Sequence, residues 1–186
     1  MKVNILGVPI HNVGLDEAVR TIIKRVDDYS FNPIPRYVAT ANVDFLVNTL
    51  SWVPGKIKHK ELYQSLIMAD LVTADGMPIV WLSALLGKRL KERVTGADLV
   101  PRLATAASVK ELSLFLLGGR EGVGEKAAKK LLIQNPGLKI AGCVSPIISL
   151  KETDSKIIDQ INKSKADILL IALGNPKQEI WFQRNK

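Results

Sequence analysis

Apolar residues along the chain follow two alternating patterns, short continuous runs and longer segments with helical spacing. In the clearest helical segment, apolar residues recur at intervals of three and four from Leu15 to Val26, with Asp16 and Glu17 in the first turn. In the clearest run, residues 112–117, almost every side chain is apolar. Such a strand is typical of a sheet that is covered on both faces.

The same two patterns predict elements over the whole chain. Strands are predicted over residues 3–10, 36–40, 70–74, 112–117, 138–144 and 167–173. The first of these segments could instead be a hairpin arm. Helices are predicted over 15–26, 43–50, 61–68, 77–86, 95–108, 125–134 and 153–164, with a last helix from 175 onward. This alternation predicts an α/β fold with a Rossmann-like, mostly parallel sheet of about five or six strands and helices on both faces. No linker or repeat is visible, so residues 1–186 are expected to form a single domain.

Composition narrows the class of protein. A chain of 186 residues with 47% hydrophobic residues is long enough to bury a core without disulfide bonds. Its one cysteine, Cys143, excludes an internal disulfide framework and a cysteine-rich metal site. The longest apolar runs, about eight residues, are far shorter than the roughly 20 that cross a membrane. Because the first residues also lack a signal-peptide pattern, a soluble cytoplasmic protein is expected.

The charge balance favours anionic partners. Lys and Arg number 26 and Asp and Glu 18, which gives a net charge of +8. Phosphates or an acidic lipid surface would suit this charge, although a solvated basic surface explains it equally well. No long block of like charge and no basic-aromatic alternation is present, so no nucleic acid is expected as a partner. Trp52, in the basic segment 51–60, is either a membrane contact or part of an ordinary loop.

Candidate ligand-binding residues follow the predicted strands at their carboxyl ends, where open α/β sheets bind ligands. Asp75 directly follows strand 70–74, where a carboxylate could take a proton from an attacking hydroxyl. The alternative is that Asp75 caps the next helix. Asp70 begins the same strand, so it is expected at the opposite edge of the sheet, too far away to pair with Asp75.

A glycine-rich turn, Gly118-Gly119, lies between a predicted strand and helix 125–134. Bare amides at such a turn suit a diphosphate, while a tight turn with positive φ is the equally weighted alternative. The segment is neither a P-loop nor the GxGxxG fingerprint of dinucleotide-binding proteins. No acidic residue ends strand 138–144 to hold a ribose, so NAD is disfavoured.

Two further segments combine polar groups with a predicted helix start. Arg93 precedes Thr95 and Gly96, and its guanidinium suits a phosphate, although a surface Arg beside a Thr cap explains it as well. After strand 167–173, Asn175 and Pro176 are explained as a helix cap and first helical residue. That explanation leaves Gln178 and Glu179 available to a ligand.

Five segments together resemble the WecG/TagA/CpsF family of glycosyltransferases, most closely its TagA branch. They are residues 39–44 (ATANVD), 74–78 (ADGMP), 92–98 (ERVTGAD), 115–119 (FLLGG) and 173–179 (LGNPKQE). The resemblance covers essentially the whole chain. It implies an inverting transfer of N-acetylmannosamine from its UDP sugar to N-acetylglucosaminyl-diphospho-undecaprenol in wall teichoic acid synthesis. Other UDP sugars, or a nucleotide-binding module without catalysis, stay open as alternatives.

The resemblance implies a role for Asp75 as the general base. Arg93 and the amides of Gly118 and Gly119 would stabilise the leaving diphosphate, while Thr40 and Asn42 would line the sugar or acceptor side. The full expected substrate-binding set is Thr40, Asn42, Gly76, Arg93, Thr95, Gly96, Gly118, Gly119, Asn175, Lys177, Gln178 and Glu179. The chain has no DxD motif and no carboxylate cluster in sequence, so neither a metal nor another cofactor is expected.

Family members usually continue beyond the helix that carries Gln178 with a basic, aromatic C-terminal segment. This chain ends at Lys186, so that segment is expected to supply most of the membrane contact in a longer form. The lipid acceptor implies peripheral attachment at the inner face of the bacterial cell membrane, with which the net charge is compatible. A homo-oligomer is also compatible with the sequence.

Overall fold

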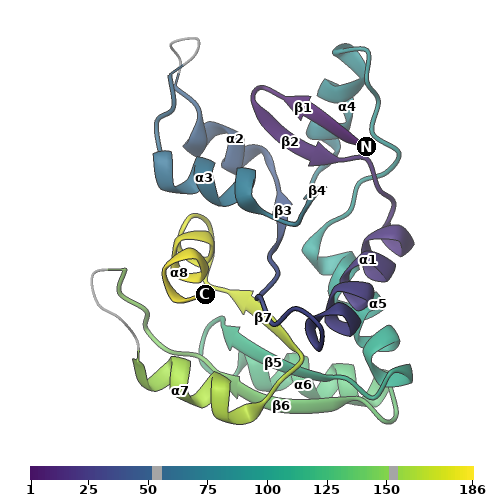
Figure 1. Ribbon diagram of the computed structural model, residues 1–186, viewed down its shortest axis with the longest axis vertical. Coiled ribbons are helices and arrows are strands. Elements are labelled where there is room, and N and C mark those ends of the chain that lie inside the picture. The colour runs from purple at the N-terminus through teal and green to yellow at the C-terminus, as the bar shows by residue number, and fades with distance from the viewer. Residues whose placement is uncertain (52–55, 151–154) are drawn as a thin grey trace. The chain divides into compact units, whose positions relative to one another are not determined.

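The structure is a computed structural model that describes residues 1–51, 56–150 and 155–186. The chain divides into two compact units, Met1–Val100 and Pro101–Lys186, whose elements are labelled in Figure 1. Trp52 and the predicted helix start at Thr153 lie outside the described residues.

The first unit begins with a hairpin, β1 (Lys2–Ile5) and β2 (Val8–His11), whose strands pair antiparallel. Leu6 and Gly7 both have positive φ, as a two-residue hairpin turn requires, and the amide of Gly7 donates to the Asn4 Oδ1 at 2.7 Å. The remaining elements are α1 (Leu15–Tyr29), β3 (Val38–Ala41), α2 (Val43–Thr49), α3 (Lys60–Met68), β4 (Leu71–Ala74) and α4 (Met77–Leu85). The next helix, α5 (Gly96–Val109), starts in this unit and contains the unit boundary.

The core of the first unit joins the hairpin to a parallel pair of strands. β3 and β4 are in register, with Thr40 opposite Thr73 and Ala41 opposite Ala74. The backbone amide of Val72 in β4 donates to the His11 Nδ1 at 2.9 Å, which ties β2 to β4. Buried side chains from the hairpin, the strand pair and three helices pack into one cluster, among them Val3, Ile10, Ala41, Phe45, Leu62, Leu66, Val72 and Ile79.

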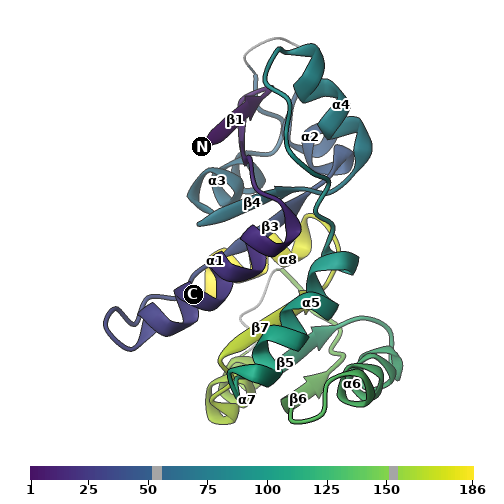
Figure 2. The same ribbon diagram turned by 90° about the vertical axis from the view of Figure 1, so that its right-hand side faces the viewer.

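The second unit is a three-stranded parallel sheet with the order β6-β5-β7. Its elements are β5 (Ser113–Gly118), α6 (Val123–Gln134), β6 (Lys139–Val144), α7 (Ser155–Ser164), β7 (Ile168–Ala172) and α8 (Lys177–Asn185). Phe115 and Leu117 point to the face covered by α7 and by Trp181 of α8. α6 lies on the other face, where its Gly124 is close to Cys143, whose neighbour in the sheet is Leu116 (Figure 2).

The predicted α/β class and parallel pairing are confirmed. The predicted sheet of five or six strands differs from the structure, because the described strands form a hairpin, a parallel pair and a parallel triplet. The first predicted strand, 3–10, is in fact the two short arms of that hairpin, so its residues do not extend the parallel sheet. The prediction of a single domain stays a prediction.

No described helix combines the length and the apolar character that crossing a membrane would need.

Candidate active site

Asp75 lies at the carboxyl edge of the β3-β4 pair. Its amide donates to the carbonyl of Ala41 at 2.8 Å, which continues the strand pairing by one residue and fixes the backbone at this position. The residue that caps α4 is Gly76, with φ of 135°, so the Asp75 side chain is not used as the cap. Its Oδ2 atom instead lies 3.5 Å from the amide of Gly96, the first residue of α5. The carboxylate is thus half-buried and makes a long, weak hydrogen bond at the N-terminus of α5, the positive end of that helix.

Asp70 has a structural role at the opposite end of β4. Its two carboxylate oxygens accept from the guanidinium of Arg36 at 3.2 Å and from the amide of Tyr37 at 3.0 Å. Five residues of extended chain separate Asp70 from Asp75, a distance of about 16 Å. The expectation that the two carboxylates do not form a catalytic pair is therefore consistent with the geometry.

The segment that leads into α5 runs beside the end of β4. The amide of Val94 donates to the carbonyl of Ala74 at 2.8 Å, and the hydroxyl of Thr73 donates to the carbonyl of Val94 at 3.0 Å. A side chain at position 96 would begin 3.7 Å from the Thr40 Oγ1, so Gly96 lies next to β3 as well. The first unit therefore brings Thr40, Asp75, Gly76, Arg93, Thr95 and Gly96 to one sheet edge.

Asp98 organises the side chains at the start of α5. Its Oδ2 accepts from the guanidinium of Arg93 at 3.0 Å and from the hydroxyl of Thr95 at 2.8 Å. In return the Thr95 Oγ1 accepts from the amide of Asp98 at 3.1 Å, which caps the helix. Sequence reasoning omitted Asp98 from the site. The signal was present, because Thr95 and Asp98 have the spacing of a capping box, in which a Thr and an acidic side chain three residues on bind each other's groups.

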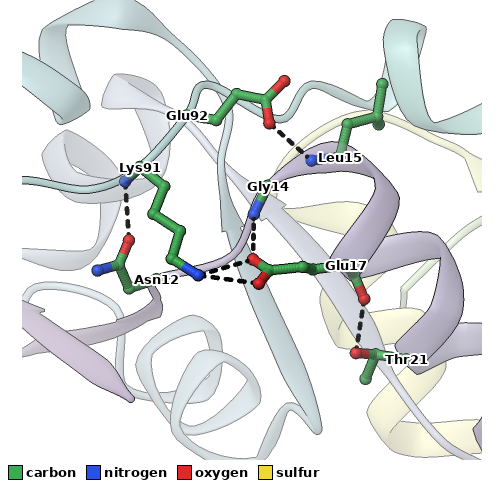
Figure 3. Close-up of polar contacts among 7 residues, drawn as sticks. All are labelled: Asn12, Gly14, Leu15, Glu17, Thr21, Lys91 and Glu92. Carbon is green, nitrogen blue, oxygen red and sulfur yellow. Dashed lines mark hydrogen bonds and ion pairs between the residues drawn. The ribbon is translucent and has the colours of Figure 1, made fainter.

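The segment before Arg93 is held by the start of α1 (Figure 3). The amide of Lys91 donates to the Asn12 Oδ1 at 2.7 Å, and the Glu92 Oε2 accepts from the amide of Leu15 at 2.9 Å. The ammonium of Lys91 also donates to the two oxygens of Glu17 at 2.8 and 3.1 Å. We call these contacts the 12–92 clasp. It fixes the backbone directly before Arg93.

The carboxylate of Glu17 is stabilised by the clasp. The ammonium of Lys91 lowers the pKa of Glu17, and the amide of Gly14, which donates to this carboxylate at 2.9 Å, lowers it further. A Cβ at position 14 would lie 2.5 Å from the Glu92 Oε2, so a larger side chain there would displace the Glu92 carboxylate. The glycine therefore allows both glutamates to reach the first turn of α1.

Asn42 has the capping role that its position predicts. Its Oδ1 accepts from the amide of Phe45 at 3.1 Å, which begins α2 directly after β3. The cap therefore uses the carbonyl oxygen of the Asn42 side chain. Asn42 follows Ala41, and Asp75 follows Ala74 opposite it in the sheet.

In the second unit, Gly118 is the last residue of β5 and Gly119 follows it. Both have positive φ, 101° and 80°, and a Cβ on Gly118 would lie 2.5 Å from the carbonyl oxygen of Ala172. The amide of Gly119 donates to that same carbonyl at 2.8 Å. The positive φ values and the close approach of Ala172 therefore explain both glycines as parts of a tight turn. The Gly119 amide already has a hydrogen-bond acceptor within the protein. Diphosphate binding by these two residues stays a prediction.

The segment 174–179 follows β7. Pro176 is the residue at the N-cap of α8, so Asn175 precedes the cap, contrary to the interpretation that Asn175 caps the helix and Pro176 opens it. The Nδ2 of Asn175 instead donates to the Glu179 Oε2 at 3.4 Å. Lys177 is exposed and Gln178 half-buried at the start of the helix.

Glu179 is buried, with no exposed surface. Its Oε2 is 3.4 Å from the Asn175 amide, whereas its Oε1 has no hydrogen-bond partner among the described residues. Burial raises the pKa of Glu179 to about 7, and hydrogen bonds that include those from Gln178 and Asn175 offset part of that rise. The sequence suggested that Glu179 is available to a ligand. The structure shows a buried carboxyl whose neutral, protonated form is favoured by burial.

Metal-ligating side chains do not gather in the described parts of the chain. No group of three or more His, Cys, Asp or Glu residues there could hold a metal ion. Metal-independent chemistry nevertheless stays a prediction.

Comparison with known proteins gives one family. The sequence model of the "Glycosyl transferase WecG/TagA/CpsF family" matches residues 3–186. A protein of Staphylococcus aureus (strain MRSA252), named N-acetylglucosaminyldiphosphoundecaprenol N-acetyl-beta-D-mannosaminyltransferase, is 29% identical over 185 residues, which are 100% of this chain and 68% of the relative.

Two Bacillus proteins with the same name match a shorter part of the chain. The Bacillus subtilis (strain 168) protein is 29% identical over 123 residues, 66% of this chain and 47% of the relative. The Bacillus spizizenii (strain W23) protein is 30% identical over 116 residues, 62% of this chain and 44% of the relative. The matched region is about two thirds of the length of the Staphylococcus aureus relative and less than half of the length of each Bacillus relative.

Proposed function

Since this chain belongs to the WecG/TagA/CpsF family of glycosyl transferases, we propose that it transfers N-acetylmannosamine to the 4-hydroxyl of N-acetylglucosamine on undecaprenyl diphosphate. The donor is the UDP sugar. The names of the three relatives support the sugar, its β linkage and the lipid-linked acceptor.

The observation that carries the proposal is the environment of Asp75. This carboxylate lies at the ligand-binding edge of a parallel strand pair and does not cap α4. Among the described residues, the hydrogen bond of its side chain is the 3.5 Å contact with the amide of Gly96. A base of this kind must reach the proton that it removes. The half-buried side chain of Asp75 has that access from solvent.

The reaction is a single displacement. Asp75 takes the proton of the acceptor hydroxyl as its oxygen forms a bond to the anomeric carbon of the donor sugar. The bond from that carbon to the UDP oxygen breaks, and UDP leaves with the electron pair. One such step inverts the α-linked donor to a β-linked product, in agreement with the relatives' names.

Arg93 supplies positive charge for the leaving diphosphate in this proposal. Its guanidinium is exposed over 44% of its surface, and Asp98 holds only one of its two terminal nitrogens in the contacts described. A guanidinium can bind phosphate oxygens through parallel N–H groups. With Arg93 in this role, transfer is expected to continue in EDTA.

The lipid acceptor places the enzyme at the inner face of the bacterial membrane, as a peripheral protein. Thr40 and Asn42 are the proposed sugar or acceptor contacts in the first unit. Gly118, Gly119, Asn175, Lys177, Gln178 and Glu179 stay proposed substrate contacts in the second, with Glu179 acting from a buried position.

The test is release of UDP from UDP-N-acetylmannosamine with a short-chain lipid diphosphate carrying N-acetylglucosamine. Asp75→Asn is expected to lower kcat by about 100-fold or more, the usual contribution of a general base. Asp16→Asn, an exposed first-turn carboxylate on α1, is the matched control and should turn over normally. Acceptor-dependent turnover that survives Asp75→Asn in a folded protein would refute the assignment. Competing UDP-glucose and UDP-N-acetylmannosaminuronate identify the donor.

A further inference from the structure

α4 has an exposed face that is apolar throughout. Met77, Trp81 and Leu85 recur every four residues on this helix, and 61% of Trp81 and 84% of Leu85 are exposed. Ala84 lies on the same stripe, and Leu86 after the helix is 48% exposed. On the other face, Ile79, Val80 and Ser83 are buried against the unit's core, where α4 contacts β1 and β4. Figure 2 shows α4 at the outer border of the first unit.

Such a face is unusual for a surface helix in water. Surface helices normally present charged residues opposite their buried stripe, whereas a helix that is apolar all round is normally covered. The only polar side chain in α4 is Ser83, and it is buried, with its hydroxyl donating to Val80 and accepting from the amide of Leu90. An exposed stripe that includes Trp and Leu therefore marks a contact surface.

The charge next to the stripe indicates what covers it. Residues 77–91 contain Lys88, Arg89 and Lys91 and no Asp or Glu. The ammonium of Lys91 is paired with Glu17, while Lys88 and Arg89 are exposed directly after the helix. A second copy of this segment would bring apolar side chains but no carboxylate for these cations. An anionic lipid surface offers acyl chains to the stripe and phosphates to the cations.

We propose that the α4 stripe (Met77, Trp81, Leu85 and Leu86) and the adjacent Lys88 and Arg89 dock this protein on an anionic lipid bilayer. The inference rests on the proposed function, because a lipid-linked acceptor must be met at the membrane surface. Only Gly76 separates Asp75 from α4, and Leu85 lies about 12 Å further along the helix axis. The α4 stripe therefore begins two residues after Asp75, the proposed base. Docking by this stripe would bring the lipid headgroups close to Asp75.

Flotation of the 186-residue chain with vesicles tests the surface. Binding is expected to vesicles that contain phosphatidylglycerol and to be much weaker with phosphatidylcholine alone. Leu85→Glu is expected to lower the partition coefficient about ten-fold or more. Lys88→Ala/Arg89→Ala should lower it about 30-fold, since each cation near an anionic surface contributes about five-fold.

Matched controls lie on α6 of the second unit. Ile133 is 81% exposed, nearly as much as Leu85, but sits in a lysine-containing helix, so Ile133→Glu should leave binding unchanged. Lys129→Ala/Lys130→Ala is the corresponding charge control. Equal loss of binding in the α4 and α6 variants, or no loss in either α4 variant, would overturn the proposal. So would a wild-type dimer in sedimentation velocity that Leu85→Glu dissociates while vesicle binding persists.

Turnover separates this surface from the proposed function. Leu85→Glu should transfer normally to a water-soluble short-chain acceptor and about ten-fold more slowly to the same headgroup on a long lipid in vesicles. Equal rates of the variant and the wild type on the vesicle-bound acceptor contradict the docking surface. If the wild type uses neither acceptor yet still binds vesicles through α4, the proposed function fails and the docking surface stands.

Discussion

The guanidinium of Arg93 and the carboxylate of Asp98 are 3.0 Å apart, and the Asp98 oxygen that binds Arg93 also accepts from the hydroxyl of Thr95. Both charged side chains are more than 40% exposed, and an ion pair of that kind usually contributes about 0–1 kcal/mol to stability. The ion pair therefore contributes little to the free energy of unfolding. In the structure the pair orients the Arg93 side chain toward Asp98, at the edge that carries Asp75.

Asp98 is predicted to act as a positioning residue for Arg93. Asp98→Asn keeps an oxygen that can accept from Thr95 but removes the charge that holds the guanidinium. We expect kcat/KM to fall by about ten-fold while the free energy of unfolding changes by less than about 1 kcal/mol. Steady-state kinetics and urea denaturation of the same variant give both values.

A double-mutant cycle supplies the control for this prediction. If Asp98 acts through Arg93, Asp98→Asn has no further effect on kcat/KM in an Arg93→Ala background. Independent losses that simply add, or a loss of stability as large as the loss of activity, would show that Asp98 only supports the Thr95 cap of α5.

Glu179 is predicted to make stability depend on pH. The folded pKa is raised to about 7 from a reference value of 4.5, so between these values the folded state binds more protons than the unfolded state. The stabilisation is fully present below about pH 4.5 and is lost as pH rises through about 7, by an amount on the order of 3 kcal/mol. Glu179→Gln, which carries its hydrogen permanently, should flatten this part of the profile.

The measurement is the free energy of unfolding at several pH values between 4.5 and 8 for wild type and variant. Glu121→Gln, an exposed position before α6, is the control and should follow the wild-type profile. A Glu179→Gln profile that falls as steeply as the wild type would mean that other groups cause the dependence.

The contact between Glu92 and α1 is predicted to matter more than its exposed position suggests. Glu92→Ala removes the acceptor of the Leu15 amide and should cost about 1 kcal/mol, the usual value of a helix cap. Glu92→Gln keeps an acceptor oxygen at the same reach and should recover most of that stability. Because Arg93 is the next residue, we expect the KM for the UDP sugar to rise in Glu92→Ala and much less in Glu92→Gln. Identical kinetics for the two variants would contradict this link.

Local features of the fold were readable from the sequence. The start of α1 at Leu15 and the cap of α2 by Asn42 follow from spacing and side-chain chemistry within a few residues, and both are confirmed. The division of the strands into separate sheets was not readable. It depends on which strands pair, and pairing is set by contacts between distant segments, such as the amide of Val72 with His11.

The same distinction holds for the candidate site. Asp75 and Gly96 were both singled out from sequence, but their proximity depends on the Val94 amide reaching the end of β4. The sequence predicts that Glu179 is available to a ligand, because the cap interpretation explains Asn175 and Pro176 but not Glu179. Glu179 is buried together with Ile180 and Trp181 in the first turns of α8, and such burial depends on contacts between segments that are distant in the sequence.

The 12–92 clasp also has a consequence for how the chain folds during synthesis. Its contacts join residues 74 to 79 positions apart, so the loop that they close costs more entropy than a local turn. β4 and Asp75 are made before Glu92 leaves the ribosome, so the contacts of the clasp that fix the backbone before Arg93 can form only after Asp75 is in the chain. A nascent chain that ends before Lys91 contains Asp75 but not Arg93. The proposed base and its neighbouring cation are therefore both present only once synthesis has nearly reached α5.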